Sequence, residues 1–246
     1  NELSVVYQPI VQLSDMTVAG FEALLRWEHP RRGSIPPVEF IPLAEGCNII
    51  GQLGQFAMSQ AAAQLSLWQK TTGNSTVFMS VNLSSRQILR RDLVQEVRNI
   101  LANSQVAKGT FKLELTESAV MENPEQAVFI LDKIRSMGIG LSLDDFGTGH
   151  SSLAYLSRFP FDLLKIDKTF LHDESPKKFV LLKSMINMAH ELGLKVVVEG
   201  IETDRDALQL RQLHCEFAQS YLFGEPMSAE NALRLLREQN TAAVRA

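Results

Sequence analysis

The sequence predicts an α/β protein with the architecture of a modified (β/α)8 barrel of the TIM type. From about residue 77 onward, short apolar runs alternate with helix-like stretches, which is typical of a parallel sheet with crossover helices. The chain has 246 residues, a length that favours a closed barrel over an open sheet. The start departs from this rhythm, because two strand-like runs flank a turn at Ser14 and Asp15. One strand near the N-terminus is therefore expected to run antiparallel.

The first elements follow from local patterns. Val5–Val11 and Val18–Leu25 are expected to form the hairpin. The charge-free run Gly46–Gln69 is too rich in glutamine to span a membrane and predicts a helix of a water-soluble domain. Its buried face recurs every four residues. That face consists of Leu53, Ala57, Ala61 and Leu65.

The later elements alternate along the chain. The expected strands are Val77–Leu83, Phe111–Leu115, Gly140–Leu143, Leu163–Ile166, Lys195–Val198 and Phe217–Phe223. Helices are expected to begin near Ser84 or Ser85 and after Asn123-Pro124, residues that favour helix starts. Further helical segments are expected at Ser152–Leu156, Lys177–Leu192, Asp204–Leu213 and Ala229–Glu238.

The composition is that of an ordinary globular protein, with 45% hydrophobic and 21% charged residues. Lys and Arg total 24 against 28 Asp and Glu, and this mildly acidic balance argues against binding to polymeric nucleic acid or an anionic membrane. Cys47 and Cys215 lie outside any C-x-x-C motif and are expected to be reduced thiols. No signal peptide precedes the first strand, so a cytoplasmic location is expected.

The chain is expected to fold as a single domain over residues 1–246, with a core from about 5 to 238, because no linker or repeat divides it. It begins at Asn1 without a methionine and reaches apolar sequence within a few residues. We therefore expect it to be one part of a longer multidomain protein. Any membrane association, including an anchor in the inner membrane, would belong to the other parts.

Acidic and amide side chains fall at or just past the carboxyl ends of the expected strands. In a barrel these ends meet at one mouth, so residues far apart in sequence share a small volume. Clustered carboxylates need cations to neutralise them, and carboxylate and amide oxygens suit Mg²⁺ or Mn²⁺ better than zinc. The adjacent Asp144 and Asp145 suit two ions, an arrangement used for in-line displacement at phosphorus. The residues at these ends are Glu22, Asn82, Glu114, Glu117, Asp144, Asp145, Asp167, Glu199, Glu202 and Gln219.

Each of these residues also has a purely structural interpretation. A single glutamate at a strand end is more often a solvated rim residue or a helix cap. Asp144 and Asp145 precede Gly147 and are equally suited to capping a turn. Lys165 is harder to explain in this way, because a lysine inside an apolar run requires a partner.

A series of motifs resembles the EAL family of cyclic di-GMP phosphodiesterases. Glu22-Ala23-Leu24, extended to Arg26-Trp27, is similar to the motif that names the family. Any one motif is weak, whereas the ordered set is specific and covers about Tyr7 to Pro226. The other motifs are Tyr7–Ile10, Val81–Ser84, Leu113–Glu117, Asp144–Gly149, Lys165–Asp167 and Glu199–Thr203.

The resemblance implies a barrel that hydrolyses cyclic di-GMP to linear pGpG with two Mg²⁺ or Mn²⁺ ions. It places Glu22, Asn82, Glu114 and Asp144 on the first ion, with Asp144 bridging to a second ion held by Asp145 and Glu199. Ca²⁺ is expected to inhibit, because it prefers longer bonds and more ligands than Mg²⁺.

The resemblance also implies roles for the remaining residues. Lys165 would contact the attacking water or the phosphate, and Glu199 is also a candidate general base, although two metal ions make a dedicated base unnecessary. Substrate would be held by Gln8, Arg26, Glu202 and Gln219. Glu117 would brace the loop Phe146–Ser152, which in this family links the active site to the interface of a homodimer.

The sequence departs from the family pattern at His150, Val198 and Ser220, where tyrosine, alanine and glycine are usual. Ser220 is expected to place a side chain beside the site residue Gln219, and His150 lies in the loop that the family uses for coupling to the dimer. No metal-ligand position is lost. A receptor that binds cyclic di-GMP or a partner protein without turnover is the main alternative. A two-carboxylate glycosidase would not explain Asn82 or Lys165.

Overall fold

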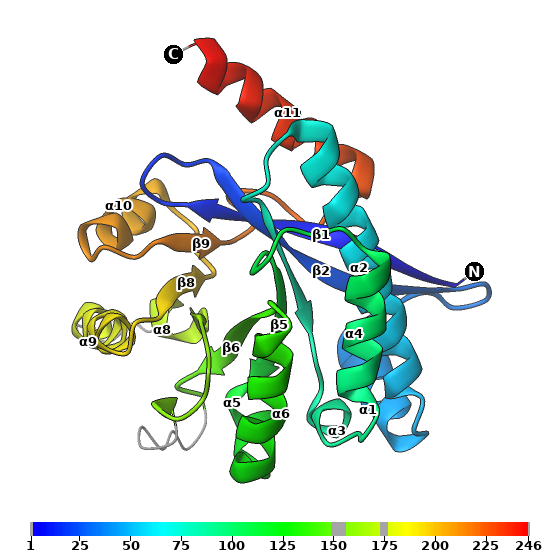
Figure 1. Ribbon diagram of the computed structural model, residues 1–246. Helices are drawn as coiled ribbons and strands as arrows, with labels where there is room; N and C mark the ends of the chain where they lie inside the picture. The colour runs from blue at the N-terminus through cyan, green and yellow to red at the C-terminus, as the bar shows by residue number, and fades with distance from the viewer. Residues whose placement is uncertain (1, 149–155, 173–176, 246) are drawn as a thin grey trace.

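The structure is a computed structural model, and it describes residues 2–148, 156–172 and 177–245 (Figure 1). Strand β1 (Leu3–Gln12) and strand β2 (Val18–His29) form the expected antiparallel hairpin, in which Gln8 pairs with Glu22. The turn between them is held by Asp15, whose side chain accepts a hydrogen bond from the Thr17 amide at 3.0 Å.

Eight strands close into a barrel in the order β1-β9-β8-β7-β6-β5-β4-β2, and β2 pairs back with β1. The strands from β2 to β9 in this ring pair in parallel, whereas β1 is antiparallel to both β2 and β9. This confirms the modified (β/α)8 barrel and its antiparallel strand. A short strand β3 (Gly33–Ile35) pairs with the outer end of β2. The other strands are β4 (Phe78–Asn82), β5 (Phe111–Thr116), β6 (Gly140–Phe146), β7 (Leu163–Ile166), β8 (Lys195–Glu199) and β9 (Phe217–Gln219).

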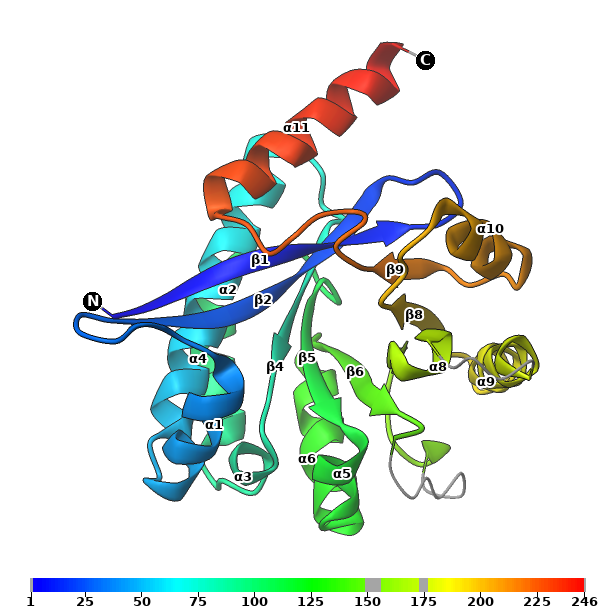
Figure 2. The same cartoon turned by 180° about the vertical axis from the view of Figure 1, so that it is seen from behind.

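Helices surround the barrel on its outer face (Figures 1 and 2). The two expected helix starts are present, since Ser84 and Gln87 form a capping box and the Asn123 side chain accepts a hydrogen bond from the Gln126 amide at 3.4 Å. None of the helices in the described ranges is both long and apolar enough to cross a bilayer. The helices are α1 (Pro37–Gly46), α2 (Ile50–Thr72), α3 (Ser85–Ile88), α4 (Leu93–Asn103), α5 (Glu117–Met121), α6 (Pro124–Ser136), α8 (Thr169–His172), α9 (Lys178–Glu191), α10 (Asp204–Gln212) and α11 (Ala229–Arg245).

The structure corrects the expected elements at a few places. The strand expected over Phe217–Phe223 ends at Gln219, because the chain turns there and the Phe223 and Gly224 amides both bond to the Ser220 carbonyl. Helix α1 was not expected, and α11 continues past Glu238. Most of the expected turn at Ser152–Leu156 lies outside the described residues. Cys47 is exposed, Cys215 is buried, and both are free thiols, as expected.

Two apolar cores stabilise the barrel. The larger one lies between the strands and the helices and includes the predicted α2 residues Ala57, Ala61 and Leu65. The smaller one is a separate cluster of Ile10, Phe78, Leu163, Val197 and Phe217. Because side chains alternate along a strand, Val197 shares its face of β8 with Lys195 before it and Glu199 after it. Along this face of β8, the small cluster thus lies between Lys195 at the start of the strand and Glu199 at its end.

Candidate functional site

Lys165 lies at the centre of the carboxylates that the sequence places at the strand ends. Its side chain is 1% exposed, and its Nζ atom lies 2.8 Å from Glu199 Oε1 and 3.1 Å from Glu22 Oε2. The same nitrogen lies 3.1 Å from Glu114 Oε2 and 3.6 Å from Asp144 Oδ1. The four acids come from β2, β5, β6 and β8. Sequence-distant residues are thus brought together, and the buried lysine has the partners that its position requires. We call this end of the barrel the acidic mouth.

The acidic mouth perturbs the pKa of several of its groups. Burial acts to lower the pKa of Lys165, but the surrounding carboxylates raise it well above its ordinary value. Burial acts to raise the pKa of Glu22, yet Lys165 and two amide donors bring it below its usual range. For Glu114 burial wins over Lys165, and its pKa rises to about 8. The Lys165 ammonium, with the two amides, thus outweighs the effect of burial on the pKa of Glu22, but it does not outweigh burial at Glu114.

Two amides orient the Glu22 carboxylate. Asn82 Nδ2 donates to Glu22 Oε1 at 2.5 Å, and Gln219 Nε2 donates to Glu22 Oε2 at 2.6 Å. Gln219 Nε2 also lies 3.3 Å from Gln8 Oε1, on the strand that pairs with Glu22. The parallel register opposes Glu199 to Gln219 on neighbouring strands. The barrel thus gives Glu22 one orientation before any ligand binds.

Asp144 and Asp145 occupy a bulge in β6. The register with β7 shifts between Leu143 and Phe146, so that these two residues oppose the single Lys165. Asp145 has a φ of 55°, a conformation that is costly for a residue with a Cβ, and its amide bonds to Asp144 Oδ1 at 2.9 Å. Burial, together with the charge of Asp144, raises the pKa of Asp145. In a regular strand, the side chains of two adjacent residues would point to opposite faces of the sheet. The bulge at Asp144 and Asp145 interrupts this alternation.

Glu117 begins α5, is buried, and contacts the glycine loop after β6. Its Oε2 atom accepts a hydrogen bond from the Gly147 amide at 3.3 Å. The helix cap is the preceding residue, Thr116, whose hydroxyl accepts from the Ala119 amide at 3.3 Å. The interpretation of Glu117 as a helix cap is therefore wrong, because its side chain contacts the loop and Thr116 caps α5. His150 and the rest of the loop to Ser152 lie outside the described residues.

A cavity of about 540 Å³ opens at the acidic mouth. Among the residues expected in the site, it is lined by Gln8, Glu22, Asn82, Asp144, Lys165, Glu199, Glu202 and Gln219. Buried Ser220 lines it as well, so the expected extra side chain beside Gln219 is present. Sequence reasoning missed Lys168 and Tyr221, which also line it and come from turns that carry no periodic signal.

Arg26 is not part of this cavity. Its Nη1 atom donates to the Leu25 carbonyl at 2.8 Å, and its side chain lines a neighbouring cavity of about 470 Å³. Asn82 lines both cavities, so the two adjoin at its side chain.

The chemistry of the donor set suits a hard divalent cation. The donors are carboxylate and amide oxygens, and Glu114 Oε1 and Gln219 Oε1 are buried without a hydrogen-bond partner among the described residues. Within the same residues, no three Asp, Glu, His or Cys side chains stand close enough in their present arrangement to hold a metal ion. In this conformation, the charge that holds the carboxylates together is the Lys165 ammonium.

The family profile of the EAL domain matches residues 1–226. The chain belongs to the EAL domain family. It is 40% identical over 242 residues to the cyclic di-GMP phosphodiesterase NbdA of Pseudomonas aeruginosa, a match that covers 96% of this chain and 31% of that protein. It is 39% identical to the bifunctional diguanylate cyclase/cyclic di-GMP phosphodiesterase MucR of the same organism, covering 95% of this chain and 34% of MucR. The chain therefore spans about a third of the length of these EAL proteins.

Solved EAL structures have the same fold as this chain. The PaMucR phosphodiesterase in its c-di-GMP complex superimposes with a TM-score of 0.89 at 39% identity, over 94% of each chain. The EAL enzyme Bd1971 in its cAMP and cyclic-di-GMP bound form gives a TM-score of 0.91 at 35% identity, covering 96% of this chain and 65% of that one.

Proposed function

We propose that this EAL domain is a phosphodiesterase that hydrolyses cyclic di-GMP to linear pGpG with two divalent metal ions. The observation that carries the proposal is the convergence of four carboxylates on Lys165 at a cavity in a member of this family, with two amides that hold the Glu22 carboxylate. The similarity to NbdA and MucR, both named as cyclic di-GMP phosphodiesterases, supports the substrate.

Two Mg²⁺ or Mn²⁺ ions would supply Lewis-acid stabilisation of charge on the phosphate and lower the pKa of a bound water. The residues expected to hold them are Glu22, Asn82, Glu114, Asp144, Asp145 and Glu199. The strand ends bring these residues to one mouth, and the bulge in β6 places Asp144 and Asp145 together opposite Lys165. Ca²⁺ would compete for the same oxygens without supporting turnover.

Lys165 would act at the phosphate. Its ammonium, which lies among these carboxylates, would donate hydrogen bonds to a phosphate oxygen or the attacking water. Glu199, whose pKa is raised by burial, would accept the proton of that water. The water oxygen would attack phosphorus and the bond to the 3′ oxygen would break. The 3′ oxygen would take a proton from solvent and leave as a hydroxyl, and Glu199 would return its proton to solvent.

Substrate would lie across the acidic mouth. Gln8, Gln219 and Glu202 line its cavity, and Arg26 lines the adjoining one. Cavities of about 300–1,000 Å³ suit small-molecule ligands, and two that meet at Asn82 suit a ligand with two nucleotide halves.

A receptor that binds cyclic di-GMP or a partner protein without turnover is the second candidate. Two observations favour it: Lys165 already forms ion pairs with carboxylates that would hold the metal ions, and buried Ser220 adds a side chain to the cavity lining. A two-carboxylate glycosidase has no such support, because the four clustered acids all face one lysine.

The deciding experiment assays the chain with cyclic di-GMP in Mg²⁺, in Mn²⁺, in Ca²⁺ and without divalent metal, with pGpG quantified by chromatography. We expect turnover in Mg²⁺ and Mn²⁺ only, and inhibition when Ca²⁺ is added to Mg²⁺. Binding of cyclic di-GMP without turnover in any metal would establish the receptor. The absence of both binding and turnover would refute the phosphodiesterase and the receptor for cyclic di-GMP.

The assembly and setting of the protein belong to the same proposal. We infer a homodimer coupled to the site through Glu117 and the glycine loop, in a cytoplasmic domain of a longer protein whose other parts provide any membrane anchor. The Glu117 contact with Gly147 supports the coupling, and the length of NbdA and MucR supports the longer protein. Sedimentation velocity of the chain with and without substrate and Ca²⁺ tests the dimer.

A further inference from the structure

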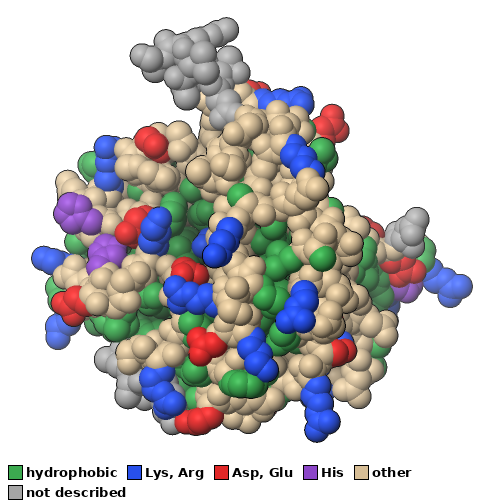
Figure 3. All heavy atoms as spheres, viewed as in Figure 1, with side chains coloured by type: hydrophobic (Ala, Val, Ile, Leu, Met, Phe, Trp, Pro, Cys, Tyr) green, Lys and Arg blue, Asp and Glu red, His purple; other side chains and the backbone are tan. Residues whose placement is uncertain are grey.

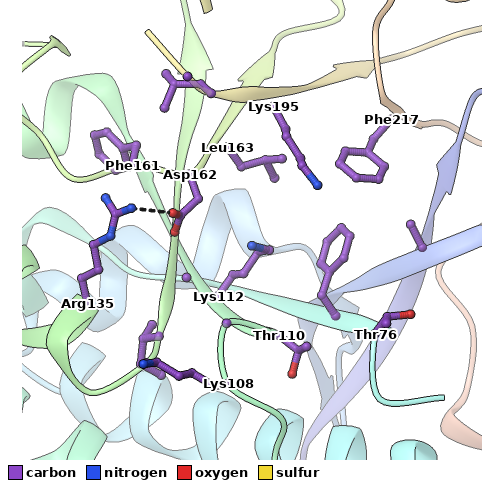
Figure 4. Close-up of a pocket in the computed structure, with 18 of the residues that line it drawn as sticks. Thr76, Lys108, Thr110, Lys112, Arg135, Phe161, Asp162, Leu163, Lys195 and Phe217 are labelled. Atoms are coloured by element: carbon purple, nitrogen blue, oxygen red, sulfur yellow. Dashed lines mark ion pairs between the residues drawn. The ribbon is translucent and has the colours of Figure 1, made fainter. Parts of the chain in front are cut away.

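A second, larger cavity lies at the opposite end of the barrel, where the parallel strands begin. It measures about 860 Å³, and its lining includes the first residues of β6, β7 and β8 and the second residue of β5 (Figure 4). Four cationic side chains line it against one carboxylate. The cations are Lys108, Lys112, Arg135 and Lys195, and the carboxylate is Asp162. We call this end of the barrel the basic mouth.

The only carboxylate of the basic mouth is already engaged. Asp162 Oδ1 lies 3.0 Å from Arg135 Nη2, the ion pair drawn in Figure 4, and Oδ2 accepts from the Leu141 amide at 3.0 Å. In the part of the chain that the structure describes, no ion pair involves Lys108, Lys112 or Lys195. Three lysines thus face one cavity without a carboxylate in contact, in a protein whose net charge is −4.

The fold makes room for these lysines. Lys112 is half-buried, and a Cβ on Gly140 would lie 2.8 Å from its Nζ atom, so only glycine at this position leaves the ammonium in place. The ammonium groups of Lys112 and Lys195 lie 5.4 and 5.8 Å from the ring centres of Phe78 and Phe217. Figure 4 shows the Lys112 and Lys195 side chains directed into the same space, with the Phe217 ring beside it.

An uncompensated group of lysines costs free energy, because each like charge opposes the others. Burial lowers the pKa of Lys112, the charge of Asp162 acts in the opposite direction, and the charge of Lys195 lowers it again, with a smaller opposing effect from Glu114. An anion in the cavity would remove this cost. Lysines bind phosphate as point charges, and several of them around one cavity match a group that carries several negative charges.

We propose that the basic mouth binds a small molecule that carries a di- or triphosphate group. Its volume lies within the range of small-molecule sites, and its position at the strand starts separates it from the acidic mouth. The space-filling view in Figure 3 shows Lys and Arg side chains spread over the face that it displays, so a control must separate this cavity from general surface charge.

The test uses inorganic tripolyphosphate as the probe, in calorimetric titrations at physiological ionic strength and in buffer stripped of divalent cations. That buffer prevents a metal ion from recruiting the probe to the acidic mouth. We expect one site per chain, and at least tenfold weaker binding to the double variant Lys112→Gln/Lys195→Gln. The matched control is Lys70→Gln/Lys183→Gln, which removes the same charge from exposed helix positions and is expected to bind within twofold of the parent chain.

A second variant tests the proposal independently in case Lys112→Gln/Lys195→Gln does not fold. Lys108 is exposed at the rim, so Lys108→Glu reverses a charge there without disturbing packing and is expected to weaken binding at least fivefold. ATP is expected to bind as tripolyphosphate does, and adenosine is expected not to bind.

Three outcomes would overturn the proposal. These are no binding by the parent chain, equal weakening in the Lys70/Lys183 control, and equally tight binding of citrate or hexaglutamate, which would assign the cavity to another class of anion. None of them bears on hydrolysis of cyclic di-GMP.

Discussion

At the acidic mouth one ammonium is surrounded by four carboxylates, whereas at the basic mouth none of three ammonium groups has a carboxylate in contact among the described residues. The same strands contribute to both ends. Strand β5 carries Lys112 at one end and Glu114 toward the other, and β8 carries Lys195 and Glu199. The fold therefore gives the lysine of one mouth carboxylate partners and leaves three lysines of the other mouth without them. A ligand of the acidic mouth must displace ion pairs of Lys165 before it binds. A ligand of the basic mouth meets lysines that form no ion pair within the described residues.

The largest effect is expected from breaking the pairing at the acidic mouth. Lys165→Met removes the cation that four carboxylates share, and loss of one partner of a buried ion pair costs about 3–5 kcal/mol. Urea unfolding at neutral pH without divalent metal measures the free energy of unfolding. Mg²⁺ is expected to restore part of the loss, and phosphodiesterase activity is expected to remain low in Mg²⁺.

Lys183→Met, at an exposed position of α9, is the control and is expected to leave the free energy of unfolding within about 0.5 kcal/mol of the parent chain. Equal stability of Lys165→Met and the parent chain would show that Lys165 does not hold the acidic mouth together.

Glu22→Gln keeps the volume of the Glu22 side chain and removes its charge. We expect turnover in Mg²⁺ to fall by about 10²–10³-fold, comparable to the loss of one preorganised electrostatic group in other enzymes. Asn82 and Gln219 donate to separate oxygens of Glu22, and glutamine offers only one, so one buried donor loses its acceptor. We therefore expect a modest fall in the melting temperature and an unchanged circular dichroism spectrum. Near-normal hydrolysis by this folded variant would remove Glu22 from the proposed ligand set.

Glu117→Ala tests whether the acidic mouth depends on the glycine loop. Because the Gly147 amide then loses its acceptor, Asp144 and Asp145 are expected to shift, and small misplacements in such sites cost about 10²-fold in kcat. Substrate affinity in Ca²⁺ is expected to change much less than kcat.

Thr116→Ala is the matched variant for Glu117→Ala, since it removes the true helix cap on the adjacent residue. It is expected to cost about 1 kcal/mol of stability and to leave kcat near normal. The proposal that Glu117 braces the loop is contradicted if Glu117→Ala lowers only stability and Thr116→Ala lowers kcat.

The smallest effect is expected at the basic mouth. Because the folded protein depresses the pKa of Lys112, it binds this proton less readily than the unfolded chain does, and the contribution of Lys112 to stability rises with pH between the depressed pKa and the ordinary value of 10.5. Lys112→Gln should therefore be more stable than the parent chain at pH 7, and the difference should shrink as the pH approaches 10.5. Denaturant unfolding at pH 7, 8.5 and 10 measures this trend. A difference that stays constant or grows with pH contradicts it.

Much of the acidic mouth could be predicted because barrel geometry converts strand ends into neighbours. Glu22, Glu114, Asp144 and Glu199 are far apart in sequence but lie around Lys165, as their strand positions indicated. The end of β9 was not predictable from pattern, because Tyr221-Leu222-Phe223 is as apolar as a strand and only the bonds to the Ser220 carbonyl end it.

Other features required tertiary structure. The position of Arg26 depends on how α1 and α2 pack beside β2. The presence of an arginine in the sequence did not indicate that its side chain would line a cavity separate from that of the acidic mouth. The basic mouth left a weak signal in the sequence, since Lys112 and Glu114 share one face of a strand. A lysine at a strand start is usually a solvated rim residue, so the convergence of Lys112 with Lys195 needed coordinates.

The antiparallel course of β1 has a consequence for how this barrel is joined to other domains. Leu3 pairs with Trp27, beyond Glu22 on β2, so the chain enters on the side of the acidic mouth. At the other end, Gln239 in α11 accepts a hydrogen bond from the Val18 amide at 3.0 Å, beside the basic mouth. The two ends of the described chain therefore lie toward opposite mouths of the barrel, so the entry of β1 is nearer the carboxylates and the Gln239 contact of α11 is nearer the lysines.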